Sequence, residues 1–380
     1  MFFRYGNWKN FDFILLAVTL VIFAIGLSFL FSASYQQYDA EEGLTLHSLV
    51  VKQIIRFALA FFIAIIILKV DYQKWLELAY PLYLLNVILL AMVLLLGQTR
   101  LGAQRWISLG FIGFQPSEFS KLIVIFTLAR YLGQKENALG NNLFWRKGLK
   151  YSKTLVVSFL IVGAPFILIV KQPDLGTALT LIPILLAMLY VWGTSIKTLL
   201  LVSLPCVVAS PFLWHMLKPY QKRRVLVFLD PNIDPLGAGY TVIQSKIAIG
   251  SGGLLGKGWL AGTQNQLNFL PERHTDFIFS VVGEEWGFLG AALLLTLYMV
   301  LILKGFSIAQ RTLNTSGRLL ACGIVVLFAF QVVVNIAMTI GLVPVVGLPL
   351  PLISYGGSSL FLNIASIAFL LNVGMKRAVF

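Results

Sequence analysis

"FDFILLAVTLVIFAIGLSFLFSA", residues 11–33, contains one charged residue, Asp12, in 23 positions. A helix needs about 20 mainly apolar residues to cross the hydrocarbon core of a bilayer, so this segment predicts a membrane-spanning helix. Basic residues precede it, as they do in a signal peptide. However, its apolar run is longer than a signal core and no clear small-residue cleavage site follows, so we expect the helix to be retained.

Similar apolar runs recur along the 380-residue chain, which is 58% hydrophobic with a mean hydropathy of +0.87. Backbone polar groups find no water in lipid, so spanning segments must be helices rather than an open sheet. The pattern predicts an all-α integral membrane protein, with one transmembrane domain over residues 1–380 and about ten helices. We expect one large extracytoplasmic loop at about 216–274. The expected spans are residues 11–33, 50–69, 76–97, 118–132, 154–171, 175–192, 196–215, 275–303, 318–341 and 355–375.

The formal net charge of +14 does not indicate a nucleic-acid-binding protein. The basic residues are spread over loops at the membrane edges instead of being gathered on one soluble face. With a cytoplasmic N-terminus, 16 of the 29 Lys and Arg lie in cytoplasmic segments, and only 6 lie in short outer loops and helix ends. This bias predicts a multi-pass protein of the cytoplasmic (inner) membrane with both termini inside. By the same count, 11 of the 15 acids lie outside or near outer helix ends.

Two outer segments share a Gln-Pro-x-acid pattern. In the first, Gln115-Pro116-Ser117-Glu118 resembles a helix start, and Glu118 and Lys121 share a helix face. Ordinary capping with a local ion pair is the stronger interpretation of that spacing alone. In the second, Asp174 either complements a helix N-terminus or has a functional role, and an ionisable group so near hydrocarbon leaves the two balanced.

Two further outer segments, residues 216–274 and 344–360, are less specific. The first is rich in glycine, and an amphipathic helix lying on the membrane surface over 240–250 is one interpretation. Its "GSGG" and "GKG" are weak phosphate-binding signals because no Walker pattern accompanies them. The second, "PVVGLPLPLISYGGSSL", has three prolines and indicates either an extended segment beside a cavity or a simple interhelical loop.

"FLPERHTDFIFSVVGEEWG", residues 269–287, concentrates charge just before a long apolar run. We expect Thr275 to cap the helix that follows and Asp276 to lie in its first turn, where Asp276, Ser280 and Gly283 share one face. Glu284 and Glu285 point elsewhere, and we expect Glu285 to pair with another helix. A first-turn acid stabilised by the helix dipole is the structural alternative for Asp276. Convergence with other outer charges favours a catalytic site. Those charges are Arg105, Glu118, Asp174 and Arg273.

Four stretches together resemble the SEDS family of bacterial cell-wall polymerases, and its elongation members more than its division members. They are "GAQRWISLGFIGFQPSEFSK", "QPDLGTAL", "LVPVVGLPLPLISYGGSS" and the segment from "FLDPNIDPLGAGY" to "HTDFIFSVVGEEWGFLG". The resemblance covers nearly the whole chain. In "EEWG", Trp286 replaces the leucine common in the family.

The resemblance implies a peptidoglycan glycosyltransferase that polymerises lipid II on the outer face of the membrane during cell elongation. It implies a class B penicillin-binding protein transpeptidase as partner, within the rod complex (elongasome). The essential aspartate of the family's "HTDFIF" motif falls on Asp276. The family's cavity residues fall on Glu118 and Lys121, and the aspartate of "QPDLGT" falls on Asp174.

A diphosphate leaves a sugar without protonation, so one base suffices, and we expect Asp276 to take the proton of the acceptor's 4-hydroxyl. A single displacement of this kind inverts the anomeric centre. Positive charge must offset the leaving diphosphate, and a divalent cation (Mg²⁺ or Mn²⁺) is an alternative source of it. We expect Ser280 to help bind the substrate. The cationic candidates are Arg105, Lys121, Arg223 and Arg273.

Two other functions remain open at this point. A flippase or other transporter of lipid-linked sugars needs a polar path through the midplane, for which the candidates are few and neutral: Asn86, Gln331, Asn335 and Asn363. A scaffold for the transpeptidase leaves the outer acids unexplained. Three histidines in the whole chain argue against a His-rich zinc centre.

Overall fold

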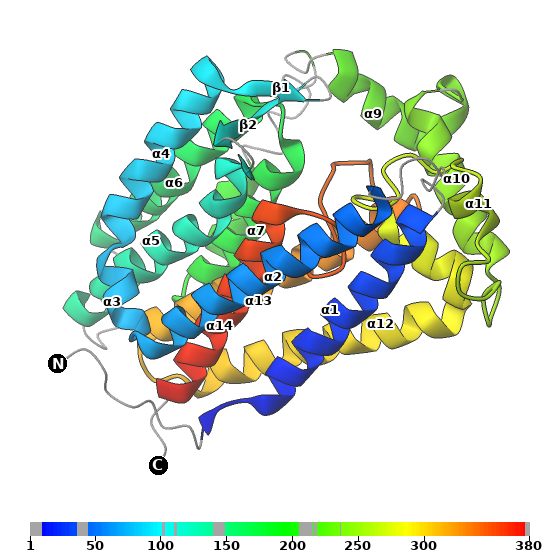
Figure 1. Ribbon diagram of the computed structural model, residues 1–380. Coiled ribbons are helices and arrows are strands. Elements are labelled where there is room, and N and C mark those ends of the chain that lie inside the picture. The colour runs from blue at the N-terminus through cyan, green and yellow to red at the C-terminus, as the bar shows by residue number, and fades with distance from the viewer. Residues whose placement is uncertain are drawn as a thin grey trace.

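The computed structural model describes residues 10–35, 45–100, 103–109, 112–139, 149–204, 215, 219–235 and 237–376. These residues form a bundle of long helices with a small sheet and several short helices at one end (Figure 1). The bundle helices are α1 Phe13–Ser34, α2 Thr45–Lys69, α4 Ala79–Leu96, α5 Pro116–Leu139, α6 Leu149–Lys171, α7 Leu175–Val191, α12 Ile278–Arg311, α13 Thr315–Thr339 and α14 Gly357–Lys376. The short elements are α3 Tyr72–Glu77, β1 Gln98–Arg100, β2 Ala103–Leu109, β3 Ile112–Phe114, α9 Pro219–Leu229, the 3₁₀ turn η4 Pro231–Ile233, α10 Ala238–Ser251 and α11 Thr263–Gln266.

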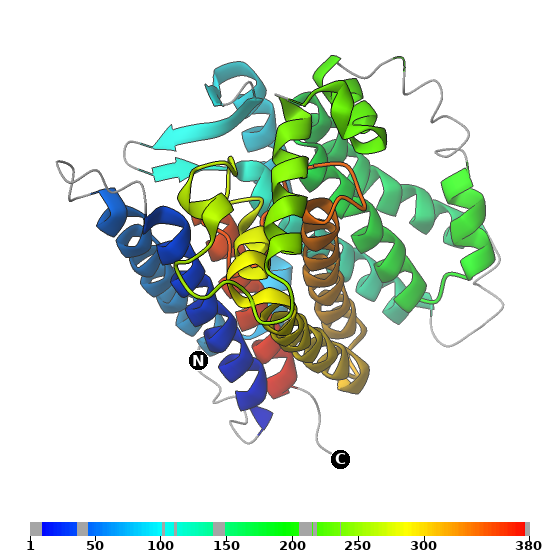
Figure 2. The same ribbon diagram turned by 90° about the vertical axis from the view of Figure 1, so that its right-hand side faces the viewer.

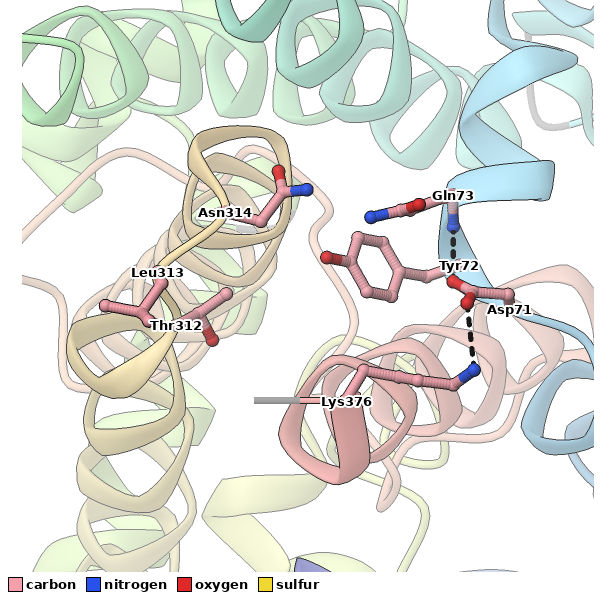
Figure 3. A pocket seen from close by; sticks show the side chains of 7 residues that line it. All are labelled: Asp71, Tyr72, Gln73, Thr312, Leu313, Asn314 and Lys376. Carbon is pink, nitrogen blue, oxygen red and sulfur yellow. Dashed lines mark hydrogen bonds and ion pairs between the residues drawn. The ribbon is translucent and has the colours of Figure 1, made fainter. Parts of the chain in front are cut away.

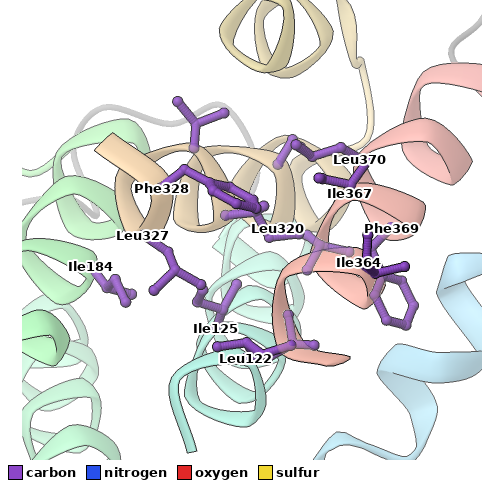
Figure 4. Packing of buried hydrophobic residues seen from close by; sticks show 14 of the residues in the cluster. Leu122, Ile125, Ile184, Leu320, Leu327, Phe328, Ile364, Ile367, Phe369 and Leu370 are labelled. Atoms are coloured by element: carbon purple, nitrogen blue, oxygen red, sulfur yellow. The ribbon is translucent and has the colours of Figure 1, made fainter. Parts of the chain in front are cut away.

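Helix α13 is the centre of the bundle, since it packs against α5, α7, α12 and α14. The core at this junction is made of interlocking aliphatic and phenyl side chains (Figure 4). Leu320 and Phe328 of α13, Ile125 of α5 and Leu370 of α14 are fully buried there. A closely packed centre of this kind fixes where the surrounding helix ends lie.

The outer helices have the opposite distribution, with large apolar side chains facing outward. Phe62 of α2, Leu84 of α4 and Leu160 of α6 are more than 60% exposed. In water such surfaces would aggregate, whereas in lipid they meet hydrocarbon. Among the residues that the structure describes, seven helices are long and apolar enough to cross a membrane, and α7 is a shorter apolar helix. The prediction of a polytopic helical membrane protein is therefore confirmed.

The predicted count of ten spans is only partly tested. Nine of the ten expected segments contain one of the bundle helices. The tenth, 196–215, is helical over 196–204, and most of its remainder lies outside the described residues. That the whole chain is one domain stays a prediction.

A three-stranded antiparallel sheet, β1-β2-β3, was not predicted from the sequence. It joins α4 to α5 and lies at the end of the bundle where α9 and α10 lie (Figure 2). This end is outside the apolar part of the helices, so the requirement for helical backbone in lipid does not apply there.

The segment at 216–274 is also more regular than the expected loop. Its described residues contain α9, η4, α10 and α11. Helix α10, for which a place on the membrane surface was one interpretation, packs against α12 and α13. Ser245 of α10 bonds to Ser280 of α12 with 2.6 Å between the hydroxyl oxygens, and a side chain at Gly283 would meet Ile249. The small residues Ser280 and Gly283 of α12 thus let α10 approach closely. Helix α10 covers the face that they share, so this face is not an open groove.

Helix α12 is kinked at Gly287, which has φ 64° and ψ −157°. A side chain at Gly256 would overlap the carbonyl of Glu285, and one at Gly287 would overlap the backbone of the 253–256 segment. The chain at 253–258 therefore lies directly on the kink, and Phe288 N donates to the carbonyl of Gly253 at 2.9 Å. Only glycine allows both the positive φ and the contact between the two backbones.

Glu284, fully buried beside this kink, holds the same segment by its side chain. Its carboxylate accepts hydrogen bonds from Lys257 Nζ at 2.8 Å, from the backbone N–H of Gln264 at 2.9 Å and of Asn265 at 3.3 Å, and from Thr263 Oγ1 at 3.2 Å. A buried charge is tolerated when it is paired and bonded in this way. Glu284 thus has a structural role.

Glu285 pairs with another helix, as predicted, since Ser32 of α1 and Asn265 both donate to its carboxylate. Both glutamates therefore tie α12 to Asn265 of α11, and Glu285 also ties it to α1. Neither of them lines the polar cavity described below.

In the described part of the chain, every ion pair joins two residues predicted for the same side of the membrane. A polar cavity of about 260 Å³ lies at the predicted cytoplasmic end, where Lys376 pairs with Asp71 at 2.8 Å (Figure 3). The contacts agree with the predicted alternation of the loops, while its absolute direction stays a prediction. The pairs at this end are Asp12–Lys304, Asp71–Lys376 and Glu136–Arg318; those at the other end are Arg105–Asp174, Glu118–Lys121, Arg223–Asp234 and Lys257–Glu284.

The Glu284 contacts predict a marked difference between two acid-to-amide substitutions. Glu284→Gln leaves Lys257 and two backbone donors facing an amide in a buried site, and we expect it to lower the free energy of unfolding by about 3 kcal/mol. Asp71→Asn removes an exposed ion pair but keeps a residue able to cap α3, and we expect a loss under about 1 kcal/mol. Equilibrium unfolding in detergent, followed by circular dichroism, measures both. Equal losses would contradict a special role for Glu284.

Candidate functional site

The larger cavity at the other end of the bundle has a volume of about 410 Å³. It contains three acids predicted to act together, Glu118, Asp174 and Asp276, and the cation Arg105. These residues come from α5, the start of α7, the turn before α12, and β2. The full lining is Arg105, Trp106, Gln115, Glu118, Asp174, Thr177, Arg224, Glu272, Thr275, Asp276, Val346, Gly347, Pro349, Tyr355, Gly356, Gly357, Ser358 and Ser359.

Four helices begin at the wall of this cavity. Glu118 lies in the first turn of α5, Asp174 is the N-cap of α7, and Ser358 lies in the first turn of α14. Asp276 lies two residues before the start of α12. The N-terminal end of a helix carries partial positive charge and unpaired N–H groups, so the arrangement favours negative charge inside the cavity.

Asp174 is committed to structure. Its carboxylate caps α7 through the N–H of Thr177 at 3.3 Å and accepts from Gln115 Nε2 at 3.1 Å and Ser117 Oγ at 2.9 Å. Arg105 Nη1 lies 3.7 Å from it. These donors occupy the carboxylate, which holds the starts of α5 and α7 together.

Glu118 is paired with Lys121, as predicted, at 2.8 Å. Both side chains are buried, and Lys121 is fully inaccessible. Lys121 therefore does not line the cavity and acts on it only through Glu118. The second oxygen of Glu118, Oε2, is buried and has no hydrogen-bond partner among the described residues. Lys121 thus neutralises the Glu118 carboxylate through Oε1, while Oε2 accepts no hydrogen bond from the described residues.

Asp276 is the acid that no donor satisfies. Within the described residues its carboxylate accepts no hydrogen bond, and it lies half-buried in the cavity wall. Burial, followed by the charge of Glu272, raises the pKa of Asp276 to about 6, against the opposing effects of Arg224 and Arg105. A carboxyl with a pKa this close to neutrality is suited to take and return a proton.

The predicted cap at Thr275 is wrong. Helix α12 begins at Ile278 and Phe277 is its N-cap, so Asp276 lies in the preceding turn and not in the helix. The reason is tertiary. Asn335 Nδ2 donates to the carbonyl of Asp276 at 2.9 Å and Ser354 Oγ to that of Thr275 at 2.6 Å, which holds this turn in a non-helical conformation.

A third bond, from the N–H of Tyr355 to the carbonyl of His274 at 2.9 Å, completes the support of the turn. The proline-rich segment at 344–355 forms a strap without regular helix or strand that turns at 351–354. It lines the cavity at Val346, Gly347 and Pro349, so the interpretation that placed it beside a cavity is confirmed. Gly347 in this strap has φ 75°, and a Cβ there would stand 3.4 Å from Asp276 Oδ2. Main-chain support from two other segments fixes the position of the Asp276 carboxylate.

Three predicted substrate-binding residues lie away from the cavity. Arg273 is buried and its Nε donates to the carbonyl of Ala33 at the C-terminal end of α1, at 2.6 Å; burial lowers its pKa. Arg223 is exposed and pairs with Asp234 at 2.8 Å. Ser280 is fully buried against α10. Their placement follows from packing that the spacing of residues in the sequence does not reveal.

Several cavity residues were missed in the sequence. The most important of them is Arg224, which lines the cavity. Its neighbour Arg223 was predicted instead, but successive side chains of a helix point about 100° apart, and it is Arg224 that reaches the cavity. Asn335, considered above as part of a transport path, supports Asp276. Tyr355 lines the cavity with the Arg56 guanidinium 4.8 Å from its ring centroid. Glu272 also lines it, with φ 51° in a tight turn. The concentration of charge in residues 269–287 was the signal in the sequence that included Glu272.

Within the described ranges, no three His, Cys, Asp or Glu side chains come together as a metal-binding group. Glu272 and Asp276 are the only acids of the cavity that are not committed to an ion pair or a helix cap.

Comparison with known proteins agrees with this geometry. The model of a family described as "Cell cycle protein" (FtsW/RodA/SpoVE) matches residues 12–378. The peptidoglycan glycosyltransferase MrdB of Escherichia coli K12 is 43% identical over 80% of this chain and 79% of its own. The probable peptidoglycan glycosyltransferase FtsW of Trichlorobacter lovleyi is 38% identical over 97% and 95%.

Solved structures are similar over almost the full length. A chain from a structure titled "Structural coordination of polymerization and crosslinking by a peptidoglycan synthase complex" matches with a TM-score of 0.78 and 36% identity, over 97% of this chain and 99% of that one. The rod shape determining protein RodA of Thermus thermophilus matches with a TM-score of 0.70 and 30% identity, over 98% and 100%. The family expected from the sequence motifs is thus confirmed: the chain belongs to the SEDS family, the FtsW/RodA/SpoVE group of cell cycle proteins.

Proposed function

We propose that this protein is a peptidoglycan glycosyltransferase that joins the disaccharide units of lipid II into glycan strands during cell elongation. Membership of the SEDS family and relatives named peptidoglycan glycosyltransferase support it. The observation on which the proposal depends is the state of Asp276. It is the one cavity acid among the described residues without an ion pair, a cap or a hydrogen bond, and its pKa is raised to about 6.

The reaction follows from that state. The 4-hydroxyl oxygen of the acceptor sugar attacks C1 of the donor sugar while the hydroxyl proton passes to Asp276. The bond between C1 and the diphosphate oxygen breaks, and its electron pair leaves with the polyprenyl diphosphate. One displacement inverts the configuration at C1. Since the diphosphate is a good leaving group, no second carboxylic acid is required to protonate it, in contrast to glycoside hydrolysis.

The remaining cavity residues provide charge and position. Arg105 and Arg224 place positive charge near the reacting atoms, and four helix N-terminal ends add partial positive charge. Glu118 lines the same wall, where Lys121 neutralises its charge. Any Mg²⁺ or Mn²⁺ ion is proposed to enter with the diphosphate of the substrate.

We assign the cavity to the extracytoplasmic face and both termini to the cytoplasm, because the basic residues are concentrated at the opposite end. The substrate then reaches the cavity already on the outer side. A class B penicillin-binding protein transpeptidase is the proposed partner. The similar chain in a structure of a peptidoglycan synthase complex that coordinates polymerization and crosslinking supports a crosslinking partner. A place in the rod complex (elongasome) is part of the proposal.

A flippase is less well supported. Two of its candidate midplane residues are used internally: Asn335 donates to the carbonyls of Asp276 and Leu348, and Asn86 accepts from Ser120 at 2.9 Å. These contacts hold the structure together, so the two residues have a structural role. A scaffold function is compatible with catalysis.

Replacing the proposed base tests the function directly. Asp276→Asn keeps the size of the side chain but removes its basicity, and we expect polymerisation of purified lipid II in detergent to fall by at least about 100-fold. Asp230→Asn, an exposed acid away from the cavity that caps a turn, is the matched control and should retain wild-type activity. The assay is run with a transpeptidase partner that has no glycosyltransferase activity of its own. Strand formation by Asp276→Asn at the wild-type rate would exclude Asp276 as the base.

The raised pKa of Asp276 predicts the pH dependence. The ionised form is the active base, so kcat/KM should fall about tenfold per pH unit below about pH 6 and level off above it. Glu272 raises this pKa, so Glu272→Gln should move the acid limb to lower pH. Asp230→Asn should leave it in place. An acid limb that stays where it is in Glu272→Gln would mean that another group titrates.

A further inference from the structure

A smaller cavity, of about 190 Å³, adjoins the larger one, and the two share Arg224, Glu272 and Asp276. The proposed base therefore stands at the boundary between two spaces. Helices α9 and α10 lie next to each other at this end of the bundle (Figure 1). Much of the lining of the smaller cavity comes from these two helices. Its walls are largely apolar, in contrast to the larger cavity. The apolar lining residues are Val227, Phe228, Val242, Phe277, Val343, Pro344 and Val345.

Lys246 of α10 adds a cation to this apolar space. Its side chain lies over Gly341, where φ is 75° and any Cβ would overlap Lys246 Cε. Glycine at this position therefore makes room for the lysine. Within the described residues Lys246 Nζ makes no hydrogen bond and no ion pair. A cation beside apolar walls and without a protein partner is available for an anionic ligand.

The charges of the smaller cavity favour an anion during the reaction. Arg224 and Lys246 contribute two positive charges and Glu272 one negative charge. Once Asp276 has taken the acceptor's proton it is neutral, so the lining then carries one net positive charge. The cavity lining gains this positive charge as the diphosphate leaves, so the charge stabilises the leaving group in the transition state.

We propose that the smaller cavity binds the polyprenyl diphosphate end of the donor, with Lys246 and Arg224 contacting the diphosphate and the apolar walls contacting the first isoprenoid unit. This inference rests on the proposed function. It also fits the direction of the displacement. An acceptor in the larger cavity approaches C1 from one side of Asp276, and the diphosphate departs on the other side, into the smaller cavity.

The test measures binding separately from turnover. Geranylgeranyl diphosphate is the probe, and its Kd is measured on the purified full-length protein in detergent. We expect Lys246→Gln to weaken binding about tenfold, because one charge-assisted contact is lost, and Lys246→Arg to stay close to wild type. Geranylgeraniol, which lacks the diphosphate, should bind equally to all variants. Lys171→Gln, an exposed lysine that lines neither cavity, is the control and should bind the probe like wild type.

Two results would overturn the inference. One is an unchanged Kd for the diphosphate in Lys246→Gln, given a melting temperature equal to that of wild type. The other is displacement of the probe by phosphatidylglycerol at the same concentration, which would make the cavity a phospholipid headgroup site. Lipid II polymerisation is measured in parallel. Wild-type polymerisation with an unchanged Kd would remove only this inference, whereas absence of polymerisation by wild type would remove the proposed function.

Discussion

The structure depends on where its helices begin. In a bilayer, backbone N–H groups can be left unpaired only at helix ends, because hydrocarbon offers them no partner. Three bundle helices, α5, α7 and α14, begin at one cavity, and α12 begins two residues after Asp276. Their central packing partner, α13, keeps these ends together. The membrane constraint on the backbone thus produces a site with an inherent preference for negative charge, outside the apolar layer.

That preference explains why the acids of the cavity have different roles. Asp174 satisfies the start of α7 and the side chains around it, and Glu118 is neutralised by Lys121. Each acid offsets positive charge that belongs to the fold. Asn335 of α13 and residues of the strap hold the backbone of Asp276 and of the residues before it. The Asp276 carboxylate accepts no hydrogen bond from the described residues. Asp276 is therefore a base of moderate strength, because no described residue donates a hydrogen bond to its carboxylate. In the wall of this cavity, Asp174 and Glu118 thus stabilise the fold, and Asp276 is the proposed base.

The sequence predicted the parts of the structure that depend on composition and local spacing. Apolar runs gave the helices, the Gln-Pro-x-acid pattern gave the starts of α5 and α7, and charge placed the acids at one end. It failed where tertiary contacts decide. Thr275 does not cap α12, because Asn335 and Ser354 hold that turn by its carbonyls. Arg224 reaches the cavity and Arg223 does not, since a helix turns about 100° per residue and the sequence did not show the direction of α9. The sheet pairs neighbouring segments, such as Gln98 with Trp106 and Ile107 with Phe114, and its strands are too short to appear in a search for long apolar runs.

The most direct test of the account is the position of a bound acceptor. A structure of the protein with a lipid-linked disaccharide analogue, in which the leaving oxygen is replaced by a non-cleavable group, would show which acid contacts the reacting hydroxyl. The account predicts that the acceptor's 4-hydroxyl oxygen lies within about 3.2 Å of an Asp276 carboxylate oxygen. An acceptor whose hydroxyl lies against Glu118 or Asp174, with Asp276 directed away from it, would contradict the account.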